Sequence, residues 1–405
     1  MPADSRPSSL PASWLVLLGA LIAIGPLTTD MYLPAFPAMG RDLAASPGSV
    51  EFTLAAYFIG LSVGQLFYGP VSDRYGRRLP FLAGLGLYVL ATVGCALADS
   101  VTGLAAWRFL QALGGCSGMV IVRAVVRDRC NAREAARAFS LLILVMGLAP
   151  ILAPLLGGWM VTHLGWRAIF ALLFLYGLAG LLAVYLALPE THDTRHEQPL
   201  RLGRVLADYA GLLGSRSFLG YTLVGGLAFA GMFAYIAGSP FVFIQLHGLP
   251  TELFGWAFGL NALGYVVLSQ VNARLLKTRS LTGLLRRATP MPALAGLGLS
   301  LFGLAGWLPL PLVMAGFFLY VASLGFIGPN SMAAALATHG QMAGKASALM
   351  GSLQFGLATL AGGLVGLLHD GTARPLMLVM ALCGVGAWLA LRWVEAPLPH
   401  EQGER

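Results

Sequence analysis

The sequence predicts an all-α membrane protein with twelve transmembrane helices in two halves of six. Of its 405 residues, 57% are hydrophobic and only 10% are charged, whereas a soluble domain carries about 25% charged residues. A helix needs about 20 apolar residues to cross the hydrocarbon core of a bilayer, so the chain has room for a dozen spans joined by short loops. Lipid is therefore the expected solvent for much of the protein.

Apolar runs separated by polar or Pro/Gly-rich breaks give the positions of these spans. The predicted spans are 14–37, 50–70, 79–98, 101–125, 136–162, 167–188, 217–245, 253–273, 285–307, 311–335, 345–368 and 373–394. The longest polar stretch, residues 189–216, is predicted as a cytoplasmic linker between an N-terminal half (1–188) and a C-terminal half (217–405). The first span is too long for a signal peptide and lacks a small-residue cleavage site.

The basic residues predict the orientation of the chain. Nearly all of the 25 Lys and Arg residues fall on one side of the predicted membrane, and Arg41, Arg167 and Arg374 fall on the other. Because basic loops stay in the cytoplasm, both termini are predicted to be cytoplasmic. This distribution explains the net charge of +8 without a nucleic-acid partner.

Several kinds of chemistry are not expected. The four cysteines have the spacing of neither a metal site nor a disulfide framework. The sequence lacks a G-x-x-x-x-G-K-[ST] phosphate-binding loop and an H-E-x-x-H motif. We therefore expect a protein that is not an enzyme, holds no metal or cofactor, and is not driven by ATP.

A compact motif follows the second predicted span. It reads Gly69-Pro-Val-Ser-Asp73-Arg74-Tyr-Gly76-Arg77-Arg78. We interpret it as a cytoplasmic gating loop, in which Gly69 allows close helix packing. Asp73 is expected to accept hydrogen bonds from helix N-terminal amides and from Arg127 near the end of the fourth span. The alternative is that the basic residues of this loop reflect topology alone.

A second motif lies in the predicted span 136–162. It reads Gly147-Leu-Ala-Pro150-Ile-Leu-Ala-Pro154-Leu-Leu-Gly157-Gly158. Two prolines in one span free backbone carbonyls and bend the helix, and the glycines permit close approach of a partner helix. Kinked helices also occur in many other membrane proteins.

Two charged residues, Asp30 and Arg108, lie inside predicted spans. An ionised side chain at a bilayer centre costs about 2.5–3.5 kcal/mol even on a lenient scale, so such residues usually have a function. Both lie about 10 Å from the outer end of their span at 1.5 Å per residue, which permits an ion pair without establishing it. The alternatives are that Arg108 binds backbone carbonyls and that Asp30 is a satisfied interior carboxylate.

The C-terminal half has no charged residue deep within a predicted span, so ion coupling is assigned to the N-terminal half. Aromatic, methionine and amide side chains would supply an adaptable substrate pocket. The candidates are Tyr32, Tyr57, Phe58, Met146, Phe233, Tyr235 and Asn261. For each of them, packing against lipid or a neighbouring helix is the alternative.

The chain resembles the Bcr/CflA group of drug transporters in the major facilitator superfamily. The resemblance is carried by the two motifs above and by Asp30-Met-Tyr-Leu-Pro34, Gly64-Gln65-Leu-Phe-Tyr-Gly69, Arg123-Ala-Val-Val-Arg127-Asp128, Gly238-Ser239-Pro240-Phe241 and Gly344-Lys-Ala-Ser-Ala-Leu349. It implies two pseudo-symmetric six-helix bundles around a central cavity. It also implies that Asp30 is the proton carrier, that Arg108 is its helix 4 counterpart, and that residues 147–158 form the antiporter signature.

The predicted function is proton-coupled efflux of small amphipathic drugs, similar to bicyclomycin or chloramphenicol, from the cytoplasm of a bacterium across its inner membrane. The expected partners are a small-molecule substrate, protons and the lipid bilayer, and the expected state is a monomer. The first span has no second acid, Arg108 would offset the charge of Asp30, and the spans of the C-terminal half offer only neutral polar groups. Neutral or zwitterionic substrates should therefore be favoured over dications. One alternative is export of a metabolite such as an amino acid. Another is a membrane receptor or assembly factor that transports nothing.

Overall fold

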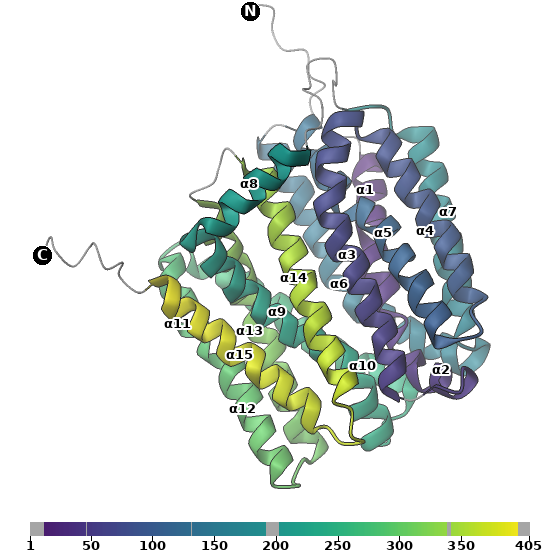
Figure 1. Cartoon of the computed structure of the whole chain (residues 1–405), viewed down its shortest axis with the longest axis vertical. Coiled ribbons are helices and arrows are strands. Elements are labelled where there is room, and N and C mark those ends of the chain that lie inside the picture. The colour runs from purple at the N-terminus through teal and green to yellow at the C-terminus, as the bar shows by residue number, and fades with distance from the viewer. Residues whose placement is uncertain (1–11, 46, 131, 192–201, 338–341, 396–405) are drawn as a thin grey trace, which may run out of the picture. The chain divides into compact units, whose positions relative to one another are not determined.

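The structure is a computed structural model that describes residues 12–45, 47–130, 132–191, 202–337 and 342–395 (Figure 1). Within these ranges the regular secondary structure is helical, and 11 helices are long and apolar enough to cross a membrane. The predicted all-α membrane fold is confirmed. The chain divides into two compact units: unit 1 contains Met1–Leu202 and Phe243–Gly259, and unit 2 contains Gly203–Val242 and Leu260–Arg405.

Unit 1 is built mainly from the helices that precede residue 190. They are α1 (Ala12–Asp30), the 3₁₀ turn η1 (Leu33–Ala35), α2 (Phe36–Asp42), α3 (Pro47–Tyr75), α4 (Arg78–Ala96), α5 (Val101–Arg129), α6 (Ala132–Leu164) and α7 (Arg167–Ala187). The first predicted span is therefore interrupted after Asp30, where α1 ends and the chain continues through η1 into α2. Asp30 is therefore the last residue of a regular α-helix, and the backbone that follows it is not α-helical until α2.

Unit 2 contains most of the remaining helices. They are α8 (Leu202–Gly214), α9 (Arg216–Pro240), the π-helical turn η2 (Phe241–Leu246), α10 (Thr251–Leu275), α11 (Leu281–Ala288), α12 (Pro290–Leu304), α13 (Leu310–Ala337), α14 (Ala343–Leu367) and α15 (Arg374–Glu395). Turn η2 crosses the unit boundary, and the first part of α10 is grouped with unit 1. The predicted span 285–307 is divided between α11 and α12, because Pro290 lacks a backbone N–H and begins a new helix.

The predicted linker 189–216 is only partly described, since residues 192–201 lie outside the described ranges. Its remainder contains α8, which packs on unit 2 through the buried Leu212. Lys345 at the start of α14 donates to the carboxylate of Asp208 at 2.6 Å. This ion pair attaches α8 to the unit that follows it.

Small residues set the helix spacing within each unit. In unit 1, a Cβ added to Gly64 of α3 would lie 2.7 Å from Cys116 of α5. In unit 2, a Cβ added to Gly296 of α12 would lie 2.6 Å from the Cα of Ala381 in α15. Membrane helices gain their association from such close contacts rather than from burial of apolar surface.

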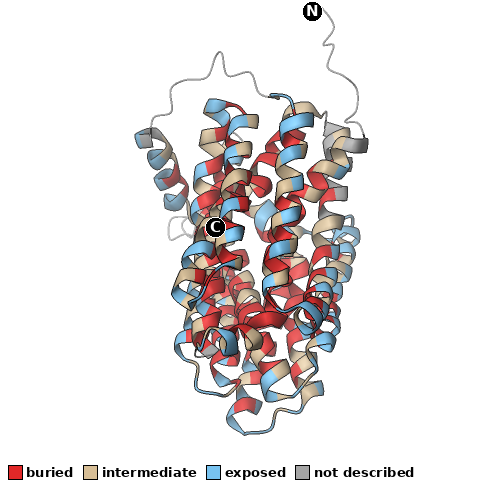
Figure 2. Cartoon of the chain, turned by 90° about the vertical axis from the view of Figure 1, so that its right-hand side faces the viewer, coloured by how far each residue is buried: buried red, intermediate tan, exposed pale blue. Residues whose placement is uncertain are grey.

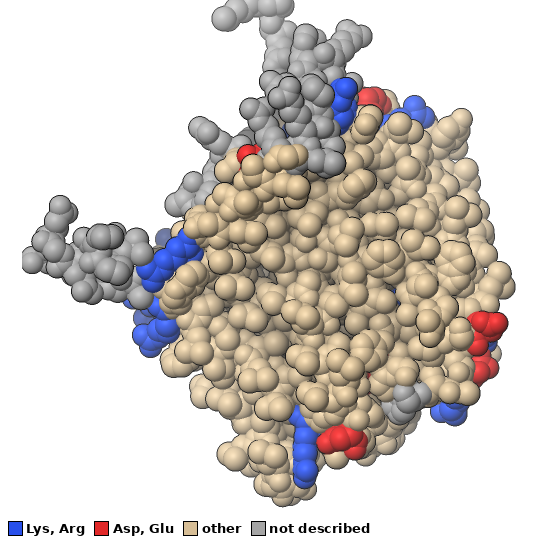
Figure 3. Space-filling view, viewed as in Figure 1, with Lys and Arg blue, Asp and Glu red and all other residues tan. Residues whose placement is uncertain are grey.

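The surfaces of the helices fit a lipid environment. Many large apolar side chains are exposed, among them Leu90 (69%) and Leu301 (68%), and Figure 2 shows exposed residues along the outward faces of the helices. On the face seen in Figure 3, charged side chains lie at the periphery and leave a broad uncharged area between them. A soluble protein rarely exposes apolar surface on this scale.

Candidate functional site

Arg108 of α5 lies at the centre of a buried polar network in unit 1. Its side chain is 0% exposed, and its guanidinium lies between two aromatic rings, 4.4 Å from the ring centre of Tyr32 and 4.2 Å from that of Tyr57. Its Nη1 donates to the side chain of Gln111 at 2.7 Å and to the backbone carbonyl of Thr28 at 3.2 Å. Its Nε and Nη2 have no hydrogen-bond partner, so three of its five N–H donors are unused in this conformation.

The network continues from Arg108 into α4 and α1. Gln111 donates to Thr92 at 2.8 Å, and Tyr88, one turn before Thr92, forms a 2.8 Å hydrogen bond with the hydroxyl of Thr28. Three helices thus meet through polar groups in the membrane-spanning part of unit 1. Such fully buried networks fix one arrangement of helices because each unpaired member is costly.

Asp30 is the last residue of α1 and is 4% exposed. Thr29 donates to its carboxylate at 3.0 Å, and within the described part of the chain no ion pair joins Asp30 to Arg108. Arg108 instead contacts the carbonyl of Thr28, two residues earlier on the same helix. The similar depth expected of Asp30 and Arg108 agrees with this contact, while a direct pair is not present in this conformation.

The Pro- and Gly-containing motif lies in α6, with Gly147, Pro150 and Pro154 inside the helix. Gly157 packs directly against the backbone that follows Asp30: a Cβ at this position would lie 2.9 Å from the Cα of Met31. On its other side, α6 meets the first part of α10, where a Cβ at Gly158 would lie 2.8 Å from the carbonyl oxygen of Thr251. The motif therefore positions the end of α1.

We expect Gly157→Ala to displace α1 from α6 and to slow transport. The new methyl group would overlap the backbone of Met31, and overpacking of this kind costs about 1–3 kcal/mol. The matched control is Gly86→Ala in α4, where a Cβ meets nothing within 4 Å and alanine should favour the helix. Thermal unfolding in detergent and transport rates would be compared. Equal values for the two variants would contradict this role of Gly157.

Arg77 is the centre of the loop motif 69–78. It is 2% exposed, and it forms ion pairs with Asp73 at 2.5 Å and with Asp128 at 2.8 Å. Burial acts to lower the pKa of the Arg77 guanidinium, but hydrogen bonds to Asp128 and Asp73 outweigh burial and raise that pKa above its ordinary value. The loop thus joins α3, α4 and α5 at one end of unit 1.

Two expectations for this loop are wrong. Asp73 pairs with Arg77 rather than with Arg127, which is exposed, because Asp128 rather than its neighbour points back toward the loop. Gly69 does not mediate close packing, because a Cβ there would meet nothing within 4 Å. Arg74 is half-buried beside the ring of Tyr75.

Glu190, which follows α7, is a further residue of this loop that the sequence pattern does not indicate. Its carboxylate accepts from the backbone N–H of Arg77 at 2.8 Å and of Arg78 at 3.1 Å, where α4 begins. Gly76 has a φ of +84°, and a Cβ there would lie 2.7 Å from the carboxylate carbon of Glu190. Arg78 also donates to the carbonyl of Tyr185 at 2.7 Å. The end of α7 therefore caps α4 and requires glycine at position 76.

We expect Glu190→Ala to lower the thermal stability of the protein. Loss of a carboxylate at a helix N-terminus costs about 0.5–2 kcal/mol. Glu190→Gln keeps one acceptor oxygen and should lose less. Asp370→Ala, which removes a carboxylate from an exposed turn in unit 2, serves as the control. If Glu190→Ala and Asp370→Ala unfold at the same temperature as the wild type, Glu190 does not stabilise this end of α4.

The predicted substrate-binding residues of unit 1 are mostly engaged with their own bundle. Tyr32 and Tyr57 stack on Arg108 and are fully buried, and the hydroxyl of Tyr32 hydrogen-bonds to Thr53. Phe58 is also fully buried, whereas Met146 in α6 is half-buried. Tyr32 and Tyr57 therefore belong to the Arg108 network in this conformation.

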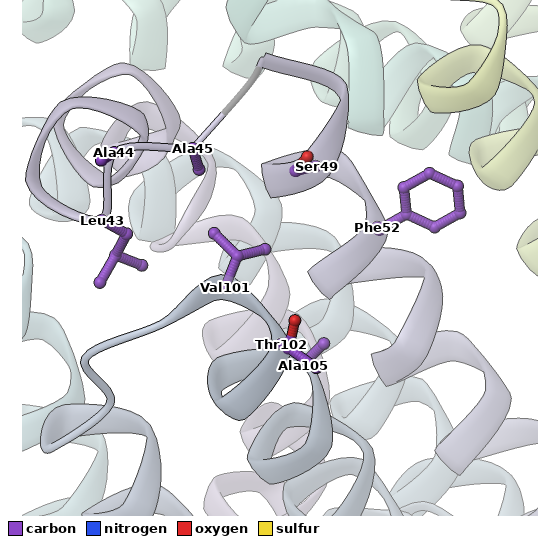
Figure 4. Close-up of a pocket in the computed structure, with 8 residues that line it drawn as sticks. All are labelled: Leu43, Ala44, Ala45, Ser49, Phe52, Val101, Thr102 and Ala105. Atoms are coloured by element: carbon purple, nitrogen blue, oxygen red, sulfur yellow. The ribbon is translucent and has the colours of Figure 1, made fainter.

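In unit 2, Asn261 donates to the hydroxyl of Tyr235 at 2.8 Å, and both are buried. Phe233 lies beside Phe355 with ring centres 5.7 Å apart. A pocket of about 450 Å³ in unit 1 contains none of the predicted binding residues (Figure 4). Its walls are Leu43, Ala44, Ala45, Ser49, Phe52, Val101, Thr102 and Ala105.

A second acid, Glu51 of α3, is buried in unit 1 and is only 2% exposed. No role is predicted for Glu51 from the sequence. It lies one residue inside the predicted span 50–70. The signal was an acidic residue in the otherwise weakly polar stretch Gly48-Ser-Val-Glu51-Phe-Thr-Leu54.

A helical protein with lipid-facing surfaces, proline-kinked spans and buried charges in one of two units is a multi-pass membrane transporter by class. The sequence profile of the Major Facilitator Superfamily matches residues 18–363. The chain belongs to the major facilitator superfamily, as its loop motif predicted. A D-xylose-proton symporter of known crystal structure has a TM-score of 0.74 at 16% identity, covering 97% of this chain and 100% of that one; at this identity the likeness concerns the fold.

Curated relatives of similar length also match. An uncharacterized MFS-type transporter, YdgK of Bacillus subtilis, is 37% identical over 92% of this chain and 93% of its own. A bicyclomycin resistance protein homolog of Haemophilus influenzae is 33% identical over 93% and 94%. Multidrug resistance protein D of Escherichia coli is 32% identical over 93% and 95%. The predicted resemblance to the Bcr/CflA group agrees with these relatives.

Proposed function

We propose that this transporter exports small amphipathic drugs from the cytoplasm in exchange for protons. The observation that carries the proposal is Asp30, a buried carboxylate at the end of α1 with one local hydrogen bond. Ionisable residues within membrane spans are costly and usually have a function. The names of two relatives, which refer to bicyclomycin and multidrug resistance, support drugs as the substrate class.

The contacts around Asp30 suggest how proton binding is linked to a change of shape. Asp30 precedes Met31, whose backbone packs on Gly157 of α6, and it follows Thr28, whose carbonyl binds Arg108. A proton on Asp30 removes a negative charge between these two contacts, so the two protonation states favour different helix arrangements. Substrate and proton can then be exchanged because each has a different affinity for the two states.

The loop around Arg77 would act as a gate at the opposite end of unit 1. Its ion pairs with Asp73 and Asp128 must separate if α3 moves relative to α5. Such interface ion pairs are typical elements of two-state transitions. We propose that this end faces the cytoplasm, that both termini lie there, and that the protein works as a monomer in the bacterial inner membrane with protons as its only energy source.

The function would be tested by a resistance and transport screen in an efflux-deficient bacterial host. We expect protection against bicyclomycin or a phenicol. In inverted vesicles that have taken up protons, addition of the same drug should release those protons. Competition by amino acids that exceeds competition by drugs would favour export of a metabolite instead. Absence of any substrate-dependent proton flux from proteoliposomes would contradict the proposal.

A further inference from the structure

Glu51 is a buried ionisable group that the mechanism above does not use. Its side chain is 2% exposed, and its Oε2 has no hydrogen-bond partner. Within the described part of the chain it forms no salt bridge. An ionised carboxylate in this position would have little contact with solvent and no ion-pair partner, which proteins avoid. A bound proton removes that difficulty.

Glu51 does not lie on the side of α3 that packs against α5. Gly60 packs on α5, because a Cβ there would lie 2.7 Å from Ala112. Glu51 lies nine residues earlier, which is about half a turn around the helix from Gly60. Phe58 and Gln65 follow it at intervals of seven residues and share its face. This stripe of α3 is buried, with Phe58 at 0% and Gln65 at 4% exposure.

The lipid-facing side of α3 is a different one. It carries exposed apolar side chains: Phe52, Ile59, Val63 and Phe67 are 38%, 43%, 44% and 59% exposed. The Glu51 stripe therefore faces neither α5 nor the exposed side. An ionisable residue within a span usually faces the bundle interior or a water-filled cavity and marks a pathway for a substrate or ion.

Glu51 lies closer than Asp30 to one end of unit 1. It is about 6 Å from the start of α3 at Pro47, whereas Asp30 is the last residue of α1 and is separated from the end of α2 by η1 and α2. The hydrogen bond between Tyr32 and Thr53 links the chain just beyond Asp30 to α3 just beyond Glu51. The two acids thus lie on neighbouring segments, with Glu51 nearer than Asp30 to this end of unit 1.

The charged groups of the neighbouring elements leave Glu51 without a counter-charge. On α2, Arg41 is exposed and Asp42 pairs with Arg167. Arg108 of α5 is engaged with Thr28 and Gln111. Asp99, between α4 and α5, is exposed. The other charged residues of α4 and α5 lie in the halves of those helices nearest the Arg77 loop.

We propose that Glu51 is a second proton-binding carboxylate of the transport cycle, so that each cycle exchanges two protons, one at Glu51 and one at Asp30, for a neutral substrate. The proposal rests on the proposed function for its coupling step. The proton binds the Glu51 carboxylate in the conformation described here. It leaves when the α3 stripe opens to water on the side to which protons are released.

Proton binding can be tested without a substrate by infrared titration of purified protein, which follows the C=O band of protonated carboxylic acids. The variants are Glu51→Gln, Asp30→Asn and the double variant, with Glu51→Asp to retain the acid. We expect each single variant to lose a different part of the wild-type band and the double variant to lose both. Asp42→Asn, which alters an exposed and paired carboxylate, should leave the band unchanged. An unchanged band in Glu51→Gln would overturn the proposal.

Coupling is tested in proteoliposomes with radiolabelled chloramphenicol as the probe. With two protons per cycle, the limiting drug concentration ratio across the membrane varies with the square of the proton concentration ratio. In Glu51→Gln the drug ratio should vary in direct proportion to the proton ratio. An unchanged exponent in Glu51→Gln would overturn the stoichiometry. If the wild type exchanges no drug, the proposed function fails, and the infrared result alone decides whether Glu51 binds a proton.

Discussion

Asp30→Asn is expected to abolish proton-coupled drug efflux while the protein still inserts and folds. Asparagine has nearly the same shape as the aspartate and can still accept the hydrogen bond from Thr29. It cannot gain or lose a proton, so the two protonation states that would favour different arrangements of α1 and α6 no longer exist. Resistance should fall to that of cells carrying an empty vector. The measurement is drug efflux from energised cells with and without a collapsed pH gradient.

The control for this prediction is Asp42→Asn. Asp42 is the last residue of α2, five residues beyond the predicted span that contains Asp30. It is exposed and pairs with Arg167 at the surface, where ion pairs contribute only about 0–1 kcal/mol. Its efflux should remain close to that of the wild type. Wild-type efflux by Asp30→Asn that is insensitive to the pH gradient would exclude Asp30 as the proton carrier.

The helices and the location of the polar chemistry could be predicted from the sequence because both follow from local patterns. Apolar runs of about 20 residues are long enough to be recognised against any background. A charge such as Asp30 or Arg108 inside such a run is equally distinct. The division of span 285–307 at Pro290 was visible in principle, since proline at the first helical position marks a helix start.

The partners of individual side chains could not be predicted in the same way. Asp128 and Arg127 are adjacent near the end of α5, and only the rotation of that helix decides which of them reaches Arg77. Glu190 lies 113 residues after Arg77, and nothing in its own neighbourhood indicates that it caps α4. Glu51 lies near a helix start, where an acid is ordinarily solvated and favoured by the helix dipole. Its burial is a property of tertiary packing.

Arg108→Lys is expected to reduce transport strongly although it keeps the positive charge. The guanidinium is planar, lies between the rings of Tyr32 and Tyr57, and donates from one nitrogen to Thr28 and Gln111. A lysine ammonium is a compact, strongly hydrated charge that cannot stack in this way. Loss of one charge-assisted hydrogen bond costs about 1.5–3 kcal/mol, so the transport rate should fall about 10- to 100-fold.

Arg167→Lys provides a matched comparison for Arg108→Lys in the same unit. Arg167 also stacks on an aromatic ring, with its guanidinium 4.2 Å from the ring centre of Trp166, and pairs with Asp42, but it is 47% exposed. Water can replace its contacts, so this substitution should change transport less than about twofold. Transport rates and thermal unfolding would be measured for both variants. Because the unused Nε and Nη2 donors of Arg108 are available only to a guanidinium, an Arg108→Lys variant as active as Arg167→Lys would show that its charge alone is sufficient.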